Sequence, residues 1–297
     1  MNPTRYVIIT PVRNEEGFMQ KTIDAMVAQT IRPTEWIIVN DGSTDKTGDV
    51  INAAAREHGW IKGVHRADRG FRKSGGGVME AFHDGYSQLK TKEWDFLVKL
   101  DGDLTFAPDY FEKCFAHFTA NPKLGIGGGL VCNEIAGQRV LDHKDDPKFH
   151  VRGATKIYSR VCWEGIGGLI KATGWDTMDE LKANMLGWKT CTFDEIPIIH
   201  HRETGGADGT WRNLVKNGRA NYIVGYHPIF MFSKCVRRFF RKPYGVAAVA
   251  LWWGFMSGYW SNIRQQVNER DVIRYLRGQQ MRALLGQKCL WKAYEVS

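Results

Sequence analysis

The chain of 297 residues is long enough for one large α/β domain, or for a domain of about 200 residues with a helical extension, which argues against two independent domains. Its content of 43% hydrophobic and 25% charged residues excludes a disordered chain. The formal net charge is +9, but much of the excess lies beside an apolar run, and no helix-turn-helix, zinc-finger or RNA-binding signature is evident. We therefore expect no nucleic acid partner.

Residues 1–105 alternate strand-like and helix-like segments. Short apolar runs predict buried strands, and apolar residues at helical spacing predict helices. The expected strands are 6–10, 36–39, 61–65 and 96–100, and the expected helices are 16–29, 46–58 and 77–90. This alternation predicts an α/β fold with a mostly parallel sheet that is covered by helices on both faces.

The beginning of the chain and its cysteines predict a compartment. Residues 1–12 have neither a charged and apolar leader nor a small-residue cleavage site, and the six cysteines are scattered without a close pair. We expect reduced thiols and a cytoplasmic location.

The C-terminal part changes in character. Helices are expected at 178–186 and 272–285, and residues 243–260 carry no formal charge. This run follows a basic cluster formed by Arg237, Arg238, Arg241 and Lys242. It is shorter than the about 20 residues that a transmembrane helix needs, and its tryptophans suit the water–lipid interface. We expect a membrane-associated helix or hairpin; a buried helix that packs on the rest of the chain is the alternative.

Polar residues follow three of the expected strands, at 10–15, 40–45 and 101–103. Ligands of parallel sheets bind beyond the carboxyl ends of the strands. Asp101 and Asp103, separated by one glycine, are able to meet a hard divalent cation such as Mg²⁺ or Mn²⁺, which would bridge the two phosphates of a nucleotide-sugar. The alternative is an ordinary turn, because Asp and Gly favour turns for local reasons.

The chain resembles the family 2 inverting glycosyltransferases, which have the GT-A fold. The resemblance rests on Thr10-Pro11-Val12-Arg13-Asn14-Glu15-Glu16, Asp41-Gly42-Ser43-Thr44-Asp45 and Asp101-Gly102-Asp103, in this order. It implies a GT-A type, Rossmann-like domain over residues 1–232, with a nucleotide-binding half (1–105) and an acceptor half (106–232). Residues 233–297 would form a basic and apolar helical extension that associates with a membrane.

The resemblance also implies roles for individual residues. It places Pro11, Arg13 and Glu15 in the nucleotide pocket, Asp41 at the base, Asp101 near the donor ribose or sugar, and Asp103 on the metal. Arg72 and Lys73 lie where the family often contacts the donor, and their charge suits a diphosphate. A solvated basic loop is the alternative for these two residues.

An inverting transfer needs a general base that deprotonates the acceptor hydroxyl. The resemblance places this base at the head of a helix, where Asp176, Asp179 and Glu180 compete. Counting back from Gly187 favours Asp176, whereas the acidic pair favours Asp179, and we rank Asp179 first, Asp176 second and Glu180 third. An acidic residue in a first helical turn also complements the helix dipole, which is the alternative.

Two adjacent histidines, His200 and His201, follow the strand-like run 196–199. In related enzymes a histidine in this region completes the metal shell, and imidazole is an acceptable ligand. Successive strand residues point to opposite faces, so at most one of the two faces the site, and we choose His201. A packed or solvent-facing histidine is the alternative.

Together these patterns predict a metal-assisted transferase that moves a sugar from a nucleotide-sugar donor to a lipid-linked or saccharide acceptor. We expect it at the inner face of the membrane, with peripheral contact through residues 236–285. A nucleotidyltransferase acting on a sugar phosphate is one alternative, although it would normally carry a Gly-rich loop after the first strand, where this chain has no glycine before Gly17. A non-catalytic, membrane-associated binding module of the same fold is the other.

Overall fold

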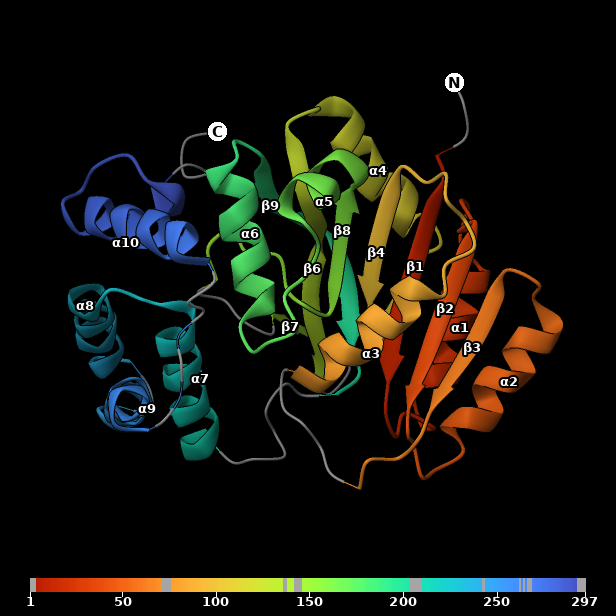
Figure 1. Ribbon diagram of the computed structural model, residues 1–297, viewed down its shortest axis with the longest axis horizontal. Coiled ribbons are helices and arrows are strands. Elements are labelled where there is room, and N and C mark those ends of the chain that lie inside the picture. Colours follow the sequence, from red (N-terminus) through yellow and green to blue (C-terminus); the bar gives the residue numbers. More distant parts are fainter. Residues whose placement is uncertain are drawn as a thin grey trace.

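The computed structural model describes residues 4–70, 76–135, 138–141, 146–202, 210–241, 244–261, 263, 265 and 269–292. Over these residues the strands form one nine-stranded sheet with helices on both faces, and a further group of helices lies beside it (Figure 1).

The first half of the chain forms a parallel sheet, because apolar strands alternate with helices that cross over between them. Its strands pair in the order β3-β2-β1-β4, all in parallel. They are β1 (Tyr6–Val12), β2 (Glu35–Asp41), β3 (Ile61–Arg66) and β4 (Phe96–Leu100), and the helices are α1 (Met19–Val27), α2 (Thr47–Glu57) and α3 (Gly76–Ser87). The predicted α/β class is confirmed, and each expected element of this half is present.

The second half of the sheet is mixed rather than parallel. It continues from β4 in the order β8-β6-β9-β5, and β7 pairs with β6. The strands are β5 (Leu104–Phe106), β6 (Leu124–Ile135), β7 (Gln138–Leu141), β8 (Thr155–Ser159) and β9 (Lys189–His200), and the helices are α4 (Tyr110–Ala120), α5 (Arg160–Ile166) and α6 (Trp175–Met185). β6 and β9 run parallel, whereas β8 is antiparallel to both β4 and β6.

Both faces of the parallel part are buried, because successive strand residues point to opposite faces. On one face Tyr6 and Ile8 pack with α1, α2 and α4. On the other face Val7 and Ile9 pack with α3 and α5. This two-sided burial explains why β1 is a continuous apolar run instead of an alternating pattern.

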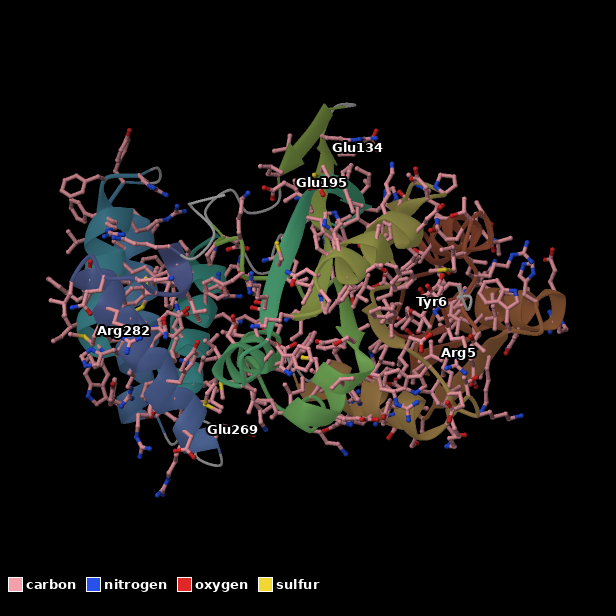
Figure 2. The ribbon with its side chains drawn as sticks, turned by 90° about the horizontal axis from the view of Figure 1, so that it is seen from above. Arg5, Tyr6, Glu134, Glu195, Glu269 and Arg282 are labelled. Atoms are coloured by element: carbon pink, nitrogen blue, oxygen red, sulfur yellow. The ribbon has the colours of Figure 1, made fainter. Side chains whose placement is uncertain are left out.

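The chain ends in a group of helices at the side of the sheet, on the left of Figure 1. They are α7 (Thr210–Val224), α8 (Pro228–Phe239), α9 (Val246–Trp260) and α10 (Arg270–Leu284), and a 3₁₀-helix (Leu290–Lys292) follows. Glu269 and Arg282 mark this group in Figure 2, at the opposite end of the molecule from Tyr6 in β1. The expected boundary at residue 232 falls inside α8, and α7 packs against α9 in the same group of helices.

None of the helices in the described part of the chain combines the length and the apolar character that crossing a bilayer requires.

Candidate active site

The segments that follow β1, β2 and β4 leave the sheet at one edge, because these three strands are neighbours and run parallel. Val12, the last residue of β1, lies opposite Asn40 near the end of β2. Beyond the strands, Nη1 of Arg13 donates a hydrogen bond of 2.7 Å to the backbone oxygen of Asp41. The first two of the three sequence motifs are therefore in contact.

Asn14 joins the loop after β1 to the loop after β2. Its φ of 55° lies in the left-handed region, which asparagine tolerates better than most residues. Its Oδ1 accepts a hydrogen bond from the backbone N–H of Thr44, and its own N–H donates to Oγ of Ser43, both at 2.9 Å. The two loops thus form one unit.

Asp41 ends β2 as a nearly buried carboxylate that is held by two arginines. Arg66 pairs with its Oδ1 at 2.5 Å, and Arg69 pairs with its Oδ2. Arg69 also contacts Glu80 of α3 at 3.1 Å. Contact between Asp41 and a nucleobase stays a prediction.

Pro11 and Arg13, two further residues that are predicted to contact the donor, differ in how deeply they are buried. Pro11 is buried within β1, where it pairs with Val39 of β2, so it is part of the sheet itself. Arg13 extends from the strand end and pairs with Asp68 at 2.6 Å. Arg72 and Lys73 lie outside the described residues.

The carboxylates of Glu15, Asp101 and Asp103 form an acidic cluster beside these loops. Asp103 is only 5% exposed, and its Oδ1 has no hydrogen-bond partner among the described residues. Glu15 pairs with Arg202 at 2.6 Å, yet burial and the charge of Asp103 raise the pKa of Glu15 to about 8. Neighbouring buried carboxylates disfavour each other's ionised form, so a cation at this point would stabilise both.

The side chain of His200, rather than that of His201, contacts this cluster, although the backbone N–H of His201 donates a hydrogen bond of 3.0 Å to the backbone oxygen of Asp103. Nε2 of His200 is 3.2 Å from Oδ2 of Asp103. The ring of His201 stacks on Phe18, and its Nε2 lies 3.0 Å from Oγ1 of Thr105. The choice of His201 as a metal ligand stays a prediction, and the contact with Asp103 makes His200 the alternative, because the two side chains point to opposite sides of the chain at the end of β9.

The residues present fit a divalent cation whose coordination shell is completed by phosphate oxygens of the donor. Among the described residues no group of three or more His, Cys, Asp or Glu side chains is arranged to hold a metal ion. Mg²⁺ typically uses one or two protein carboxylates together with substrate phosphates. The unpartnered Oδ1 of Asp103, with the imidazole of His200 beside Oδ2, meets that smaller requirement.

Asp101 is paired with a buried lysine that sequence reasoning did not single out. Lys99 in β4 is 2% exposed; its Nζ contacts the carboxylate of Asp101 and donates to the backbone oxygen of Gly153 at 2.5 Å. Gly102 permits close packing between the two aspartates and β1, because a Cβ atom there would lie 2.4 Å from Cγ1 of Val12. A lysine inside an apolar strand was the available signal for Lys99.

The three candidates for the general base differ sharply in their surroundings. Asp179 is 4% exposed; both its oxygens lie 3.0 Å from Nζ of Lys156, and Tyr158 donates to Oδ2 at 2.5 Å. Glu180 is fully buried and pairs with Lys156 at 2.8 Å. The enclosure of these two carboxylates by their partners favours Asp176 over Asp179, and the identity of the base stays a prediction.

Asp176 is the candidate on the side of the acidic cluster. It is partly exposed in the first turn of α6. Gly153, which accepts the hydrogen bond from Lys99, packs beside it, since a Cβ atom on Gly153 would lie 3.5 Å from Cβ of Asp176. Asp176 and Asp101 thus flank the same short segment.

Lys156 is the second buried lysine that sequence reasoning missed. It lies in β8 with no exposed surface, and its Nζ also donates to the backbone oxygen of Asp176 at 2.5 Å. Glu180 in turn accepts hydrogen bonds from the backbone of Val151 and from His150. The network ties the start of α6 to β8 and to the segment before β8, and so sets the position of Asp176.

A mixed sheet of this kind, with acidic residues beyond its parallel strands, is the GT-A fold. The mannosyltransferase PcManGT from Pyrobaculum calidifontis, solved in complex with GDP-Man and Mn²⁺, matches with a TM-score of 0.56 and 18% sequence identity, over 96% of this chain and 76% of that chain. A likeness at this identity concerns the fold alone.

The family model of glycosyl transferase family 2 matches residues 7–168, and the chain belongs to this family. EpsJ, an uncharacterized glycosyltransferase of Bacillus subtilis strain 168, is 31% identical over 123 residues, which are 41% of this chain and 33% of EpsJ. The glycosyltransferase GlyA of Streptococcus pneumoniae serotype 4 is 39% identical over 161 residues, which are 53% of this chain and 20% of GlyA. The chain thus matches a third or less of the length of these relatives.

Proposed function

We propose that the protein moves a sugar, with inversion, from a nucleotide-diphosphate-sugar to a lipid-linked or envelope-polysaccharide acceptor, assisted by Mg²⁺ or Mn²⁺. The observation that carries the proposal is the contact between Asp103 and His200 at the edge where the loops after β1 and β2 also meet. The family supports the transfer reaction, and the GDP-Man and Mn²⁺ of the PcManGT structure support the kind of donor and cation.

The residues of the chain would divide the work as follows. Asp103 and His200 would hold the cation, and Arg13 and Glu15 would border the donor. When bound, the cation neutralises charge on the departing diphosphate. Asp176 would accept the proton of the acceptor hydroxyl while that oxygen forms its bond to the anomeric carbon and the bond to the diphosphate oxygen breaks.

The helical group supports an acceptor at a membrane. α8 and α9 expose aromatic and aliphatic side chains, and basic residues lie at the end of α8. We propose that the protein acts at the cytoplasmic face of a membrane, where such an acceptor would be presented. The division into a catalytic domain (1–232) and a membrane-associating extension (233–297) belongs to the same proposal. The packing of α7 against α9 favours an extension that also includes α7.

The test is a thermal-shift screen of nucleoside diphosphates and their sugars with and without Mn²⁺. A ligand that binds only the folded state raises its apparent stability. We expect one nucleotide-sugar to raise Tm more with Mn²⁺ than without it, and to release its diphosphate when acceptor is added. Release of pyrophosphate from a nucleoside triphosphate and a sugar phosphate would favour a nucleotidyltransferase. Absence of any donor binding would favour a non-catalytic module.

A further inference from the structure

The excess of positive over negative charge is confined to one segment of the chain. Residues 209–268 contain nine Lys and Arg and neither Asp nor Glu, so this segment alone accounts for the formal net charge of +9. The rest of the chain is balanced. Segregation of this kind marks an electrostatic contact surface more than a general solubility device.

Within this segment α9 has apolar side chains all round. One side is buried against its neighbours through Ala247, Leu251 and Phe255. It approaches α7 so closely that a Cβ atom on Gly254 would lie 2.0 Å from the backbone oxygen of Val215. A helix that is apolar on every side is normally buried on every side.

The opposite side of α9 is not covered by the described part of the chain. It carries an exposed stripe with helical spacing, formed by Val246, Val249, Trp253 and Trp260. The ring of Trp253 lies 6.0 Å from that of Trp260. Trp260 is 69% exposed, which is unfavourable for a large aromatic side chain in water.

α8 adds a second stripe beside the first. It is formed by Ile229, Phe232, Val236 and Phe239, and Phe240 follows with 74% of its surface exposed. The rings of Phe232 and Trp252 lie 5.8 Å apart, so the two helices adjoin at this side. Arg237 and Arg241 are exposed at the same end of α8. We call the two stripes with Phe240 and these two arginines the α8–α9 surface.

We propose that the α8–α9 surface docks on a bilayer that contains anionic phospholipid, with α9 lying in the interface. At 15 residues α9 is about 22 Å long, less than the hydrocarbon thickness of about 30 Å, so it fits along the interface and not across it. Tryptophan is favoured at the level of the lipid headgroups, and arginines there attract anionic lipid. The proposal narrows the expected contact region, because the apolar side of α10 is already packed on α6.

A bilayer suits this surface better than a second copy of the chain. A symmetric dimer would bring two surfaces with Arg and without Asp or Glu against each other, and like charges oppose such contact. The biological purpose, bringing the active site to a lipid-linked acceptor, rests on the proposed function. The docking itself does not, because it is measured without donor or acceptor.

The test is flotation of the full chain with neutral phosphatidylcholine vesicles and with vesicles that also contain phosphatidylglycerol. We expect binding to the anionic vesicles that weakens at high salt. The double change Arg237→Glu and Arg241→Glu should weaken it at least about tenfold. Trp253→Ser should weaken it in low and in high salt. Val161→Ser on α5, 64% exposed and outside the surface, is the matched control and should bind like the unchanged chain.

Three results would overturn the proposal: no binding to anionic vesicles, equal loss in Val161→Ser, or a dimer in sedimentation that Trp253→Ser dissociates. The last would assign the surface to a second copy. Donor turnover on an acceptor analogue without a lipid tail is measured on the same variants and should not change. Vesicle binding without turnover would remove the proposed function alone, and turnover without vesicle binding would remove the docking alone.

Discussion

Nε2 of His200 lies 3.2 Å from Oδ2 of Asp103, at the point where β9 ends beside the acidic segment after β4. His201, one residue later, turns its Nε2 to Thr105 instead. This pair of adjacent histidines offers a matched comparison, because one ring faces the acidic cluster and the other packs on Phe18.

His200→Ala should raise the Mn²⁺ concentration needed for half-maximal donor binding by about 10- to 100-fold, since a group at the metal site is lost. Asp103→Asn should abolish the Mn²⁺-dependent part of binding. Calorimetric titration of the donor at several Mn²⁺ concentrations measures both effects. His201→Ala is the control and should keep the affinity of the unchanged chain; an equal loss there would remove His200 from the site.

Asp176→Asn should lower kcat by about 100- to 10,000-fold, because an amide does not accept the proton of the acceptor hydroxyl. The donor affinity should stay unchanged, since Asp176 lies in the first turn of α6 and not among the loops after β1 and β2. Initial rates at saturating donor, with calorimetry of donor binding, separate the two quantities. An Asp176→Asn variant with normal kcat would return the assignment of the base to an open question.

Sequence patterns predicted the part of the site that depends on chain topology. Asp41 and Asp103 follow apolar strands, and the carboxyl ends of neighbouring parallel strands meet at one edge whatever the side chains do later. The strands of the first half could also be predicted, because burial on both faces of the sheet gives long apolar runs. β6 was not predicted, because its glycines interrupt the apolar pattern of a strand. Gly127 and Gly129 leave space for the rings of Phe193 and Tyr110 instead of adding apolar surface.

The choices between neighbouring candidate residues depend on partners that are distant in sequence. No residue near Asp179 in the sequence indicates that Lys156 is its partner. Lys156 lies in β8, and its Nζ contacts both oxygens of Asp179. Likewise, which of two adjacent histidines meets Asp103 is decided by the exact end of β9, and strand ends are the least predictable feature of a sequence. Local patterns thus predict where the site lies, whereas only tertiary contacts distinguish between its candidate residues.

Lys156→Met should lower the free energy of unfolding by about 3–5 kcal/mol, because it leaves the carboxylates of Asp179 and Glu180 buried without the ammonium group that pairs with both. Urea unfolding followed by tryptophan fluorescence measures the change. Lys148→Met is the control: Lys148 is largely exposed and pairs with Asp194 at 3.1 Å, and exposed ion pairs contribute little. Equal effects of the two substitutions would contradict a structural role for the buried network.

Asp179 should make stability depend on pH. Burial, and the neighbouring charge of Glu180, raise its pKa from 3.8 to about 6 against the opposing effect of Lys156. Between these values the folded state holds a proton that the unfolded state has released. The stabilisation from this proton is therefore complete below about pH 4 and is lost as the pH rises through about 6.

Asp179→Asn provides the comparison, because an amide does not titrate in this range. The stability of the unchanged chain relative to this variant should fall with rising pH between about 4 and 6, by at most about 1.4 kcal/mol per pH unit. Unfolding curves of both chains over this range give the difference directly. A difference that stays constant with pH would show that Asp179 is ionised throughout.

Gly254→Ala should destabilise the helical group, because the added Cβ atom would meet the backbone oxygen of Val215 at 2.0 Å, and backbone cannot swing aside as a side chain does. Overpacking of this kind costs about 1–3 kcal/mol. Gly278→Ala in α10 is the matched control: beyond the backbone of its own helix, no atom of the described residues lies within 4 Å of the added Cβ atom, so the better helix propensity of alanine should stabilise by about 1 kcal/mol. Thermal unfolding of the two variants should therefore shift in opposite directions, and a shift in the same direction would contradict the close packing of α7 on α9.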